Sequence, residues 1–200
     1  MARLPFPEST ITGHYGTMSA YRKKHGLQPH SGTDFAPKGS NRGKTAIPAV
    51  AKGTVQFVKW SNVLGWVLVQ TIWDVKKRKA KYVGYCHLSC NKCGINCRGG
   101  HDSSVAISLT AGQKVAEGQT IGICGNTGSA SSGVHLHLTL SDKERGVFGV
   151  TADKEDYVKW LATQTPEKKQ TNTKTKAVVE PKQDSVKIIY ACPHCKKELN

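Results

Sequence analysis

A segment rich in glycine and serine that leads directly into an alternating apolar segment constrains this chain more than any other feature. Residues 125–133 read Gly-Asn-Thr-Gly-Ser-Ala-Ser-Ser-Gly, and residues 134–140 read Val-His-Leu-His-Leu-Thr-Leu. Small residues tolerate positive φ and let the backbone approach a ligand closely. Because successive side chains of a strand point to opposite faces, His135, His137 and Thr139 should share one face. The stretch therefore predicts a strand backed by three leucines, with two adjacent imidazoles next to a glycine loop.

Two further motifs decide whether these imidazoles are surface residues or part of a metal site. His30 and Asp34 lie four residues apart in a polar loop that contains glycine, and His87 ends a strand candidate. Zinc accepts imidazole nitrogen and carboxylate oxygen, and a catalytic zinc has three protein ligands and one open position. His30, Asp34 and either His135 or His137 would supply three ligands. The remaining histidine of that pair would stay free for proton transfer, because the unperturbed pKa of histidine lies near neutrality.

Short apolar segments separated by turn residues fill most of the chain between residues 45 and 140. The strand candidates are residues 45–50, 54–60, 66–73, 82–87, 105–109, 113–115, 119–124 and 134–140. No long helical crossover of the kind that a parallel sheet needs separates them. The pattern predicts a mainly β fold, a small antiparallel β-sheet domain. Residues 1–29 are expected to be a loop, and residues 153–161 a helix that covers the domain.

Composition divides the chain into three parts. Residues 1–161 are expected to form the domain, interrupted by a cysteine-rich insert at residues 90–101. Residues 162–187 are rich in threonine, lysine and glutamine and contain almost no aromatic residue, which predicts a flexible basic linker. Residues 188–200 then form a short C-terminal appendage.

The seven cysteines favour metal binding over a disulfide framework, because their number is odd and several are closely spaced. Cys90, Cys93, Cys97 and His101 offer four ligands for a second, structural zinc; reduced surface thiols are an equally weighted alternative. Cys192 and Cys195 match one knuckle of a zinc ribbon, a motif that needs two knuckles. Cys86 is a possible substitute ligand, although alternation along its strand places it opposite to His87. Cys124 is expected to be a small buried residue.

The charge of the chain points to anionic partners. It contains 29 Lys and Arg against 14 Asp and Glu, a formal net charge of +15. Nucleic acid, anionic lipid and an anionic cell wall all fit such a charge. Residues 74–81 form a basic hairpin tip, interpreted either as a solvated turn or as a contact for one of these polyanions. No apolar run has the length of a membrane span, and residues 1–10 show no apolar core of a signal peptide, so synthesis in the cytoplasm is expected.

Four motifs, in order along the chain, resemble those of the lysostaphin/LytM-type zinc endopeptidases. They are His-Ser-Gly-Thr-Asp-Phe-Ala at 30–36, Tyr-Cys-His-Leu-Ser at 85–89, Gly-Gln-Thr-Ile-Gly at 118–122 and the stretch 125–137. The resemblance covers about residues 11–140 and implies a small antiparallel β-sheet domain with an open groove over the zinc. It also implies that the substrates are the peptide bridges and stems of bacterial peptidoglycan.

The resemblance implies a role for each residue of the site. His30, Asp34 and His137 match the zinc ligands of the family, and His87 and His135 match its two catalytic histidines that do not bind the metal. The sequence departs from the family at Val134, where proline is usual, and at Leu138-Thr139, where Phe-Glu is usual. Residues 12–16 match an aromatic-glycine segment near the groove only loosely, which makes His14 and Tyr15 candidate substrate contacts.

Together these features predict a zinc endopeptidase that cuts peptidoglycan and also binds anionic cell-wall polymers. A basic chain with no apparent export signal fits a phage endolysin, released to the wall by a holin. Two alternatives are a nucleic-acid-binding zinc protein and a non-catalytic wall-binding module of the same fold. For nucleic-acid binding, the sequence shows neither a recognition helix nor a base-stacking aromatic cluster, which makes nucleic acid an unlikely partner. A non-catalytic wall-binding module would be expected to lack some of the five site residues, and none of them is missing.

Overall fold

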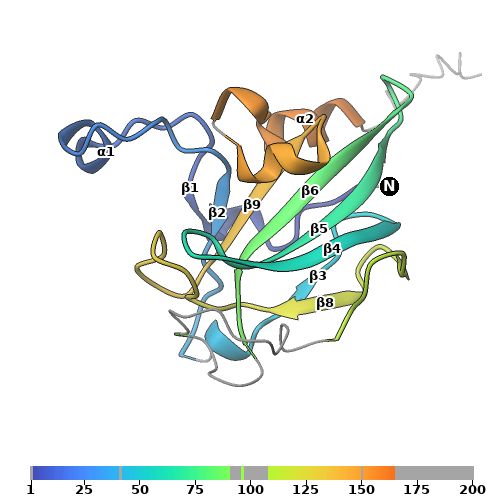
Figure 1. The fold of residues 1–200 in the computed structure, drawn as a ribbon, viewed down its shortest axis with the longest axis horizontal. Coiled ribbons are helices and arrows are strands. Elements are labelled where there is room, and N and C mark those ends of the chain that lie inside the picture. The colour runs from blue at the N-terminus through green and yellow to red at the C-terminus, as the bar shows by residue number, and fades with distance from the viewer. Residues whose placement is uncertain (1, 41, 91–95, 97–107, 150, 165–200) are drawn as a thin grey trace, which may run out of the picture. The chain divides into compact units, whose positions relative to one another are not determined.

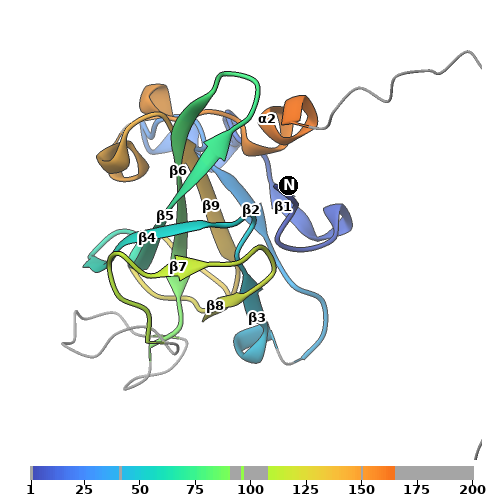
Figure 2. The same cartoon turned by 90° about the vertical axis from the view of Figure 1, so that its right-hand side faces the viewer.

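Seven antiparallel strands form one sheet in the order β1-β2-β9-β6-β5-β4-β7 (Figure 1). The computed structural model describes residues 2–40, 42–90, 96, 108–149 and 151–164. The strands of the sheet are β1 (Ile11–Gly13), β2 (Thr33–Phe35), β4 (Gly53–Ser61), β5 (Gly65–Asp74), β6 (Lys79–Leu88), β7 (Lys114–Val115) and β9 (Leu136–Ser141). A second, two-stranded sheet pairs β3 (Ala46–Pro48) with β8 (Thr120–Ile123), which lie side by side in Figure 2.

Helical segments are short and lie in the connections between strands or before the first and after the last strand. They are η1 (Glu8–Thr10), α1 (Ala20–Lys24), η2 (Arg42–Lys44), η3 (Glu144–Phe148), η4 (Thr151–Asp153) and α2 (Tyr157–Gln164). The carboxylate of Asp156 accepts hydrogen bonds from the backbone N–H groups of Val158 and Lys159, which caps α2 at its first turn. The indole Nε1 of Trp160 then donates to Asp74 Oδ2 at 2.8 Å, so α2 is fixed against the end of β5. Among the described residues, no helix has the length and apolar character that crossing a membrane requires.

The alternation predicted for β9 is present in the structure. Leu136, Leu138 and Leu140 are fully buried and belong to the main hydrophobic core. His137 and Thr139 lie on the opposite face of the sheet, where Val67 and Val69 of β5, Cys86 and Val147 form a smaller apolar cluster. The central strand β5 is buried along most of its length because both of its faces are covered. The main core therefore fixes β9, and the opposite face is left for the polar site.

The predicted fold class, a mainly β domain built on an antiparallel sheet, is confirmed. The predicted loop at residues 1–29 is wrong, because this region contains η1, β1 and α1. β1 and β2 have only three residues each, too few to show alternation in the sequence; they form because each finds a neighbouring strand to pair with. Residues 108 and 109 of the predicted strand 105–109 are not in a strand, and its other residues lie outside the described part. Residues 162–164 of the predicted linker belong to α2, and residues 165–200 lie outside the described part of the chain.

Candidate metal centre

Strand pairing brings three metal-ligating side chains together. β2 runs antiparallel to β9, with Asp34 directly opposite His137, and His30 lies in the loop that leads into β2. One ligand atom from each of these three residues lies within 4.8 Å of the others. Nδ1 of His137 is 2.8 Å from Asp34 Oδ1, and Nε2 of His30 is 3.2 Å both from Asp34 Oδ2 and from Nδ1 of His137. Two nitrogens and one carboxylate therefore converge on a single point.

Backbone contacts hold these side chains in place. The ring of His30 hydrogen-bonds through Nδ1 to the carbonyl oxygen of His14, at 3.0 Å, which leaves Nε2 directed at the cluster. Gly13 and Gly32 lie so close to the cluster that added Cβ atoms would come within 2.8 Å of Asp34 Oδ2 and of His137 Cε1 respectively. The backbone thus packs directly against two of the three candidate ligands.

The chemistry of the donor set fits zinc. Two imidazole nitrogens and one carboxylate oxygen form a known catalytic zinc set, and three ligands leave a fourth position for water or substrate. Without a cation, Nε2 of His30 and Nδ1 of His137 face each other at 3.2 Å with only Asp34 as a shared partner. A divalent ion between them would satisfy all three groups. The residues present therefore fit the metal.

Two more imidazoles border the cluster. The ring centroid of His87 is 4.8 Å from that of His135 and 5.9 Å from that of His137. His87 hydrogen-bonds through Nδ1 to the carbonyl oxygen of Thr127 at 2.8 Å, and His135 does so through Nδ1 to that of Gly133 at 2.8 Å. In each ring the Nδ1 contact to a carbonyl assigns the proton to that nitrogen, which leaves Nε2 as an acceptor. Nε2 of His135 lies 3.6 Å from Asp34 Oδ1, so this acceptor borders the metal cluster.

A β-bulge brings His87 to this face. Trp66 pairs with Leu88 and Leu68 pairs with Tyr85, so two steps along β5 match three steps along β6. His87 has φ of 63°, in the left-handed region that residues other than glycine rarely adopt. Simple alternation predicts that Cys86 and His87 point to opposite faces, and this prediction is wrong, because the extra residue interrupts the alternation. Bulges of this kind redirect side chains next to active sites.

Burial and charge set the protonation states of the cluster. Burial raises the pKa of Asp34, but hydrogen bonds from His137 and His30 outweigh it and hold that pKa well below its ordinary value. Burial lowers the pKa of His87 to about 3, with further contributions from His135 and His137. Burial also lowers the pKa of His137. At neutral pH the carboxylate is ionised and these two imidazoles are neutral, which is the state that binds a metal.

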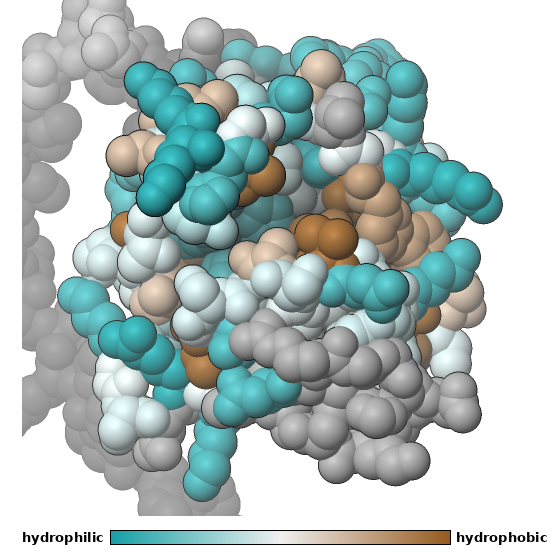
Figure 3. Space-filling model, turned by 60° about the vertical axis from the view of Figure 1, so that its left-hand side comes forward, coloured by the Kyte–Doolittle hydropathy of each residue, from teal (hydrophilic) through white to brown (hydrophobic). Residues whose placement is uncertain are grey.

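The face shown in Figure 3 has a shallow hollow, with a group of hydrophobic side chains beside it and hydrophilic side chains on its other sides. His14, a candidate substrate contact, has an exposed side chain, while its carbonyl oxygen supports His30. The other candidate, Tyr15, is half-buried, and its hydroxyl lies within hydrogen-bonding distance of the carbonyl oxygens of Thr151 and Lys154, at 3.1 and 2.8 Å. Tyr15 thus links the segment before β2 to η4, and a role for either residue in substrate binding stays a prediction.

None of the cysteines that the structure describes belongs to the metal cluster. Cys86 and Cys124 are buried, and burial raises the pKa of each thiol to about 12, as expected of inert core residues. Cys90 is buried as well. The other members of the predicted second zinc site, Cys93, Cys97 and His101, lie outside the described residues. So do Cys192 and Cys195, and both sites stay predictions.

Sequence reasoning missed the contributions of the backbone. The carbonyls of His14, Thr127 and Gly133 orient three of the imidazoles, and carbonyls leave no trace in a residue pattern. Gly32, in the segment between His30 and Asp34, was visible, and its position between two candidate ligands could have suggested a close approach. The bulge at His87 had no signal in the sequence.

The model of peptidase family M23 matches residues 28–148, a span that contains all five residues of the cluster and its border. The chain belongs to peptidase family M23. This M23 domain is similar to a zinc-containing peptidase from Vibrio cholerae, with 25% identity and a TM-score of 0.50 over 78% of this chain and 38% of that chain. It thus spans well under half of that protein. The family assignment confirms the resemblance to LytM-type peptidases.

Two further solved structures share the fold. LytU is 24% identical, with a TM-score of 0.52 over 80% of this chain and 90% of that chain. A chain from the crystal structure of the SpoIIIAH and SpoIIQ complex is 19% identical, with a TM-score of 0.50 over 80% of this chain and 99% of that chain. At these identities the likeness concerns the fold of the M23 domain alone.

Proposed function

We propose that this protein is a zinc-dependent endopeptidase that hydrolyses peptide bonds in bacterial peptidoglycan. One observation carries the proposal: a His-Asp-His ligand set and two further imidazoles meet on one face of the sheet in a chain of peptidase family M23. The ligand set is His30, Asp34 and His137, and the imidazoles are His87 and His135. The cross-bridge and the stem peptide are the two kinds of target, and product mass analysis distinguishes them.

The groups around the site suggest separate roles for the zinc, His135 and His87 in the reaction. When bound, zinc would polarise the scissile carbonyl and lower the pKa of the attacking water from about 15.7 toward about 7. Nε2 of His135 would accept the proton of that water, because this nitrogen borders the ligand set and Nδ1 is held by the carbonyl oxygen of Gly133. His87, which burial keeps neutral, would orient the water through Nε2. His135 would then return the proton to the leaving amine.

The two alternative functions have less support. A non-catalytic wall-binding module need not retain both His87 and His135 in addition to a complete ligand set, and this chain retains all five residues. Nucleic-acid binding rests on the net charge of +15, the cysteine-rich insert at residues 90–101 and the terminal pair Cys192 and Cys195. Phage origin and release by a holin stay predictions within the proposal.

Metal analysis combined with a hydrolysis assay tests the proposal. We expect the purified protein to lyse bacterial walls or to release peptides from them, and a chelator to abolish this activity. His137→Ala should lose the catalytic zinc and the activity. His135→Ala should keep the zinc and lose most turnover, about 100-fold or more if its role is general base catalysis. Zinc retention in His137→Ala would contradict the ligand assignment, and chelator-resistant or absent hydrolysis on all wall types would contradict the function.

The same metal analysis addresses the predicted structural sites. One zinc per chain would leave the cysteines unoccupied. Two or more would support a structural zinc site, formed by Cys90, Cys93, Cys97 and His101 or completed by the terminal knuckle at Cys192 and Cys195.

A further inference from the structure

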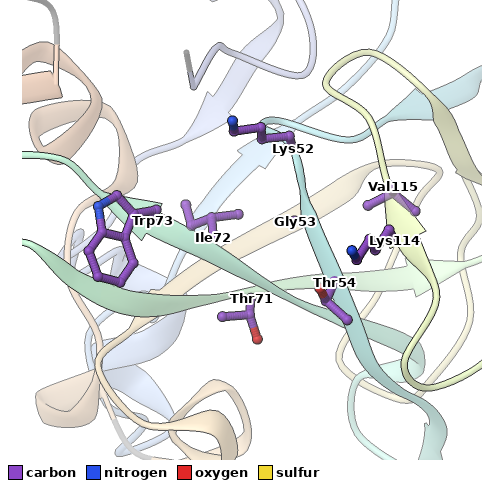
Figure 4. Close-up of a pocket in the computed structure, with 8 residues that line it drawn as sticks. All are labelled: Lys52, Gly53, Thr54, Thr71, Ile72, Trp73, Lys114 and Val115. Atoms are coloured by element: carbon purple, nitrogen blue, oxygen red, sulfur yellow. The ribbon is translucent and has the colours of Figure 1, made fainter.

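A shallow groove lies at the end of the sheet remote from the metal cluster. It is formed by the first residues of β4, the last residues of β5 and the short strand β7, and Figure 4 shows its lining: Lys52, Gly53, Thr54, Thr71, Ile72, Trp73, Lys114 and Val115. The metal cluster borders the opposite end of β5, where Trp66 pairs beside the bulge of His87. Seven residues of extended strand separate Trp66 from Trp73, a distance of about 23 Å. The groove is therefore separate from the candidate active site.

An exposed tryptophan and two unpaired cations characterise this groove. The side chain of Trp73 is 58% exposed, which is unusual for so large an apolar group. Lys52 and Lys114 are exposed, and neither forms an ion pair within the described part of the chain. In the view of Figure 4 both lysine side chains point toward the side of the groove where Ile72 and Trp73 lie.

The groove contains no compensating negative charge. None of its lining residues is acidic. The nearest carboxylate in sequence, Asp74, is fully buried and accepts hydrogen bonds from Trp160 and Gln164 on the far side of the strand. The turn at residues 75–78 follows immediately and adds exposed Lys76 and Arg78. The lining of the groove thus combines one exposed indole with two exposed lysines and no carboxylate.

We propose that this groove binds a phosphodiester-linked, sugar-bearing polymer of the bacterial cell wall. Phosphodiester groups spaced along a chain complement separate ammonium groups such as those of Lys52 and Lys114. The face of the Trp73 indole offers a large, rigid apolar surface on which the C–H face of a sugar ring packs. An open groove suits a long chain that passes through it. Single-stranded nucleic acid is less well matched, because such sites stack successive bases on several aromatic side chains and this groove offers one.

This inference rests on the proposed function only for the setting, since a wall peptidase meets such polymers next to its substrate. The groove would hold the enzyme at the wall while the metal site acts on peptides elsewhere. Binding can therefore be measured on metal-free full-length protein, independently of any hydrolysis.

The test uses three soluble probes: a glucosylated poly(glycerol phosphate), the same polymer without glucose, and an oligo(dT) strand. Lys52→Gln/Lys114→Gln should weaken binding to both phosphate polymers about tenfold at low salt, because two phosphate contacts are lost. Trp73→Ala should weaken binding of the glucosylated polymer more than that of the unsubstituted one. The matched control is Lys23→Gln/Lys24→Gln, which removes the same charge from exposed positions of α1 and should change affinity less than about twofold.

Three results would overturn the inference. Equal losses in the groove variant and the α1 control would mean that binding depends on total charge. If Trp73→Ala weakened the binding of both polymers equally, or of neither, the proposed contact between the indole and the sugar would be contradicted. Tighter binding of oligo(dT), sensitive to the same groove residues, would assign the groove to nucleic acid. Cleavage of a short soluble peptide should be unchanged in the groove variants, so a failure of the proposed hydrolysis and a failure of polymer binding are separate results.

Discussion

Gly32 lies directly against the ring of His137. A Cβ atom at this position would come 2.8 Å from Cε1 and 2.9 Å from Nε2 of that ring, and would also collide with the carbonyl oxygen of Leu138. Because the colliding backbone belongs to β9, the clash cannot be relieved by a side-chain rotation. The ring of His137, the candidate ligand, would have to move.

We therefore expect Gly32→Ala to reduce zinc affinity by about 10- to 100-fold, the range seen when the groups that orient a ligand are disturbed. Competition with a chromophoric chelator measures this affinity. Gly133→Ala is the matched control, because a Cβ there would meet nothing within 4 Å and the residue lies in the loop before the same strand. Equal affinities of the two variants would contradict the packing argument.

His87 should make the stability of the metal-free protein depend on pH. Its pKa in the folded state is about 3, below the value of about 6.5 expected for an unfolded chain, so the unfolded chain binds the proton first. The stabilising contribution is complete above pH 6.5 and is lost as the pH falls toward 3. The free energy of unfolding should decrease by up to about 1.4 kcal/mol per pH unit from this group.

Urea unfolding at a series of pH values measures this slope. His87→Asn is the control, since asparagine tolerates positive φ and does not titrate. The variant should show a smaller slope between pH 6.5 and 4.5. Asp34 acts in the same direction but at lower pH, because its pKa is also depressed and an unfolded aspartate titrates near pH 3.9. Identical slopes in the variant and the parent would contradict the role given to His87.

At the scale of the elements, strands with clear alternation were predictable and short or irregular ones were not. β9 was anticipated from Leu136, Leu138 and Leu140, because a face packed against a core requires apolar residues at every second position. The three-residue strand β2 carries Asp34 and escaped detection because its pairing comes from its neighbours. The bulge in β6 arises because the pairing of β6 with β5 shifts by one residue between the two sides of His87. Its existence depends on the partner strand, which the local sequence does not contain.

A buried lysine links β6 to the segment that leads into α2. The side chain of Lys81 has no exposed surface, and its Nζ lies 2.7 Å from Asp142 Oδ1 and 2.6 Å from Glu155 Oε1. Removing both carboxylates would leave a buried ammonium without its two ion-pair partners, whereas an apolar replacement of the lysine would leave two carboxylates that are partly exposed to water.

Asp142→Asn/Glu155→Gln should therefore lower the free energy of unfolding by about 3 kcal/mol, and Lys81→Met by clearly less. Thermal and urea unfolding of both variants measure the difference. Lys143→Gln removes a neighbouring charge whose side chain is 77% exposed and should have little effect. A larger loss in Lys81→Met than in the double variant would show that the carboxylates, rather than the ammonium, are the groups that need compensation.

At the scale of the whole molecule, the excess of positive charge should make wall binding sensitive to salt. The chain carries 29 Lys and Arg against 14 Asp and Glu, and exposed charges are screened within about 10 Å at about 0.1 M salt. Between about 0.05 and 0.5 M NaCl we expect the amount of protein bound to purified walls to fall severalfold. Hydrolysis of a short, neutral soluble peptide should change little over the same range, since its binding does not depend on the net charge. Wall binding that is independent of salt would contradict this expectation.

The sequence by itself determined which residues form the candidate site and which side of β9 faces the core. Ligand chemistry restricts zinc to a few residue types, and alternation follows from strand geometry, so His30, Asp34, His87, His135 and His137 could be named in advance. Only the tertiary structure decided how these residues meet. The register of β2 against β9 joins segments about 100 residues apart. The bulge that turns His87 depends on the pairing of β5 with β6, and the carbonyls that orient His30 and His87 belong to residues 14 and 127. Such pairing is a property of the folded chain, because each contact exists only when its distant partner is in place.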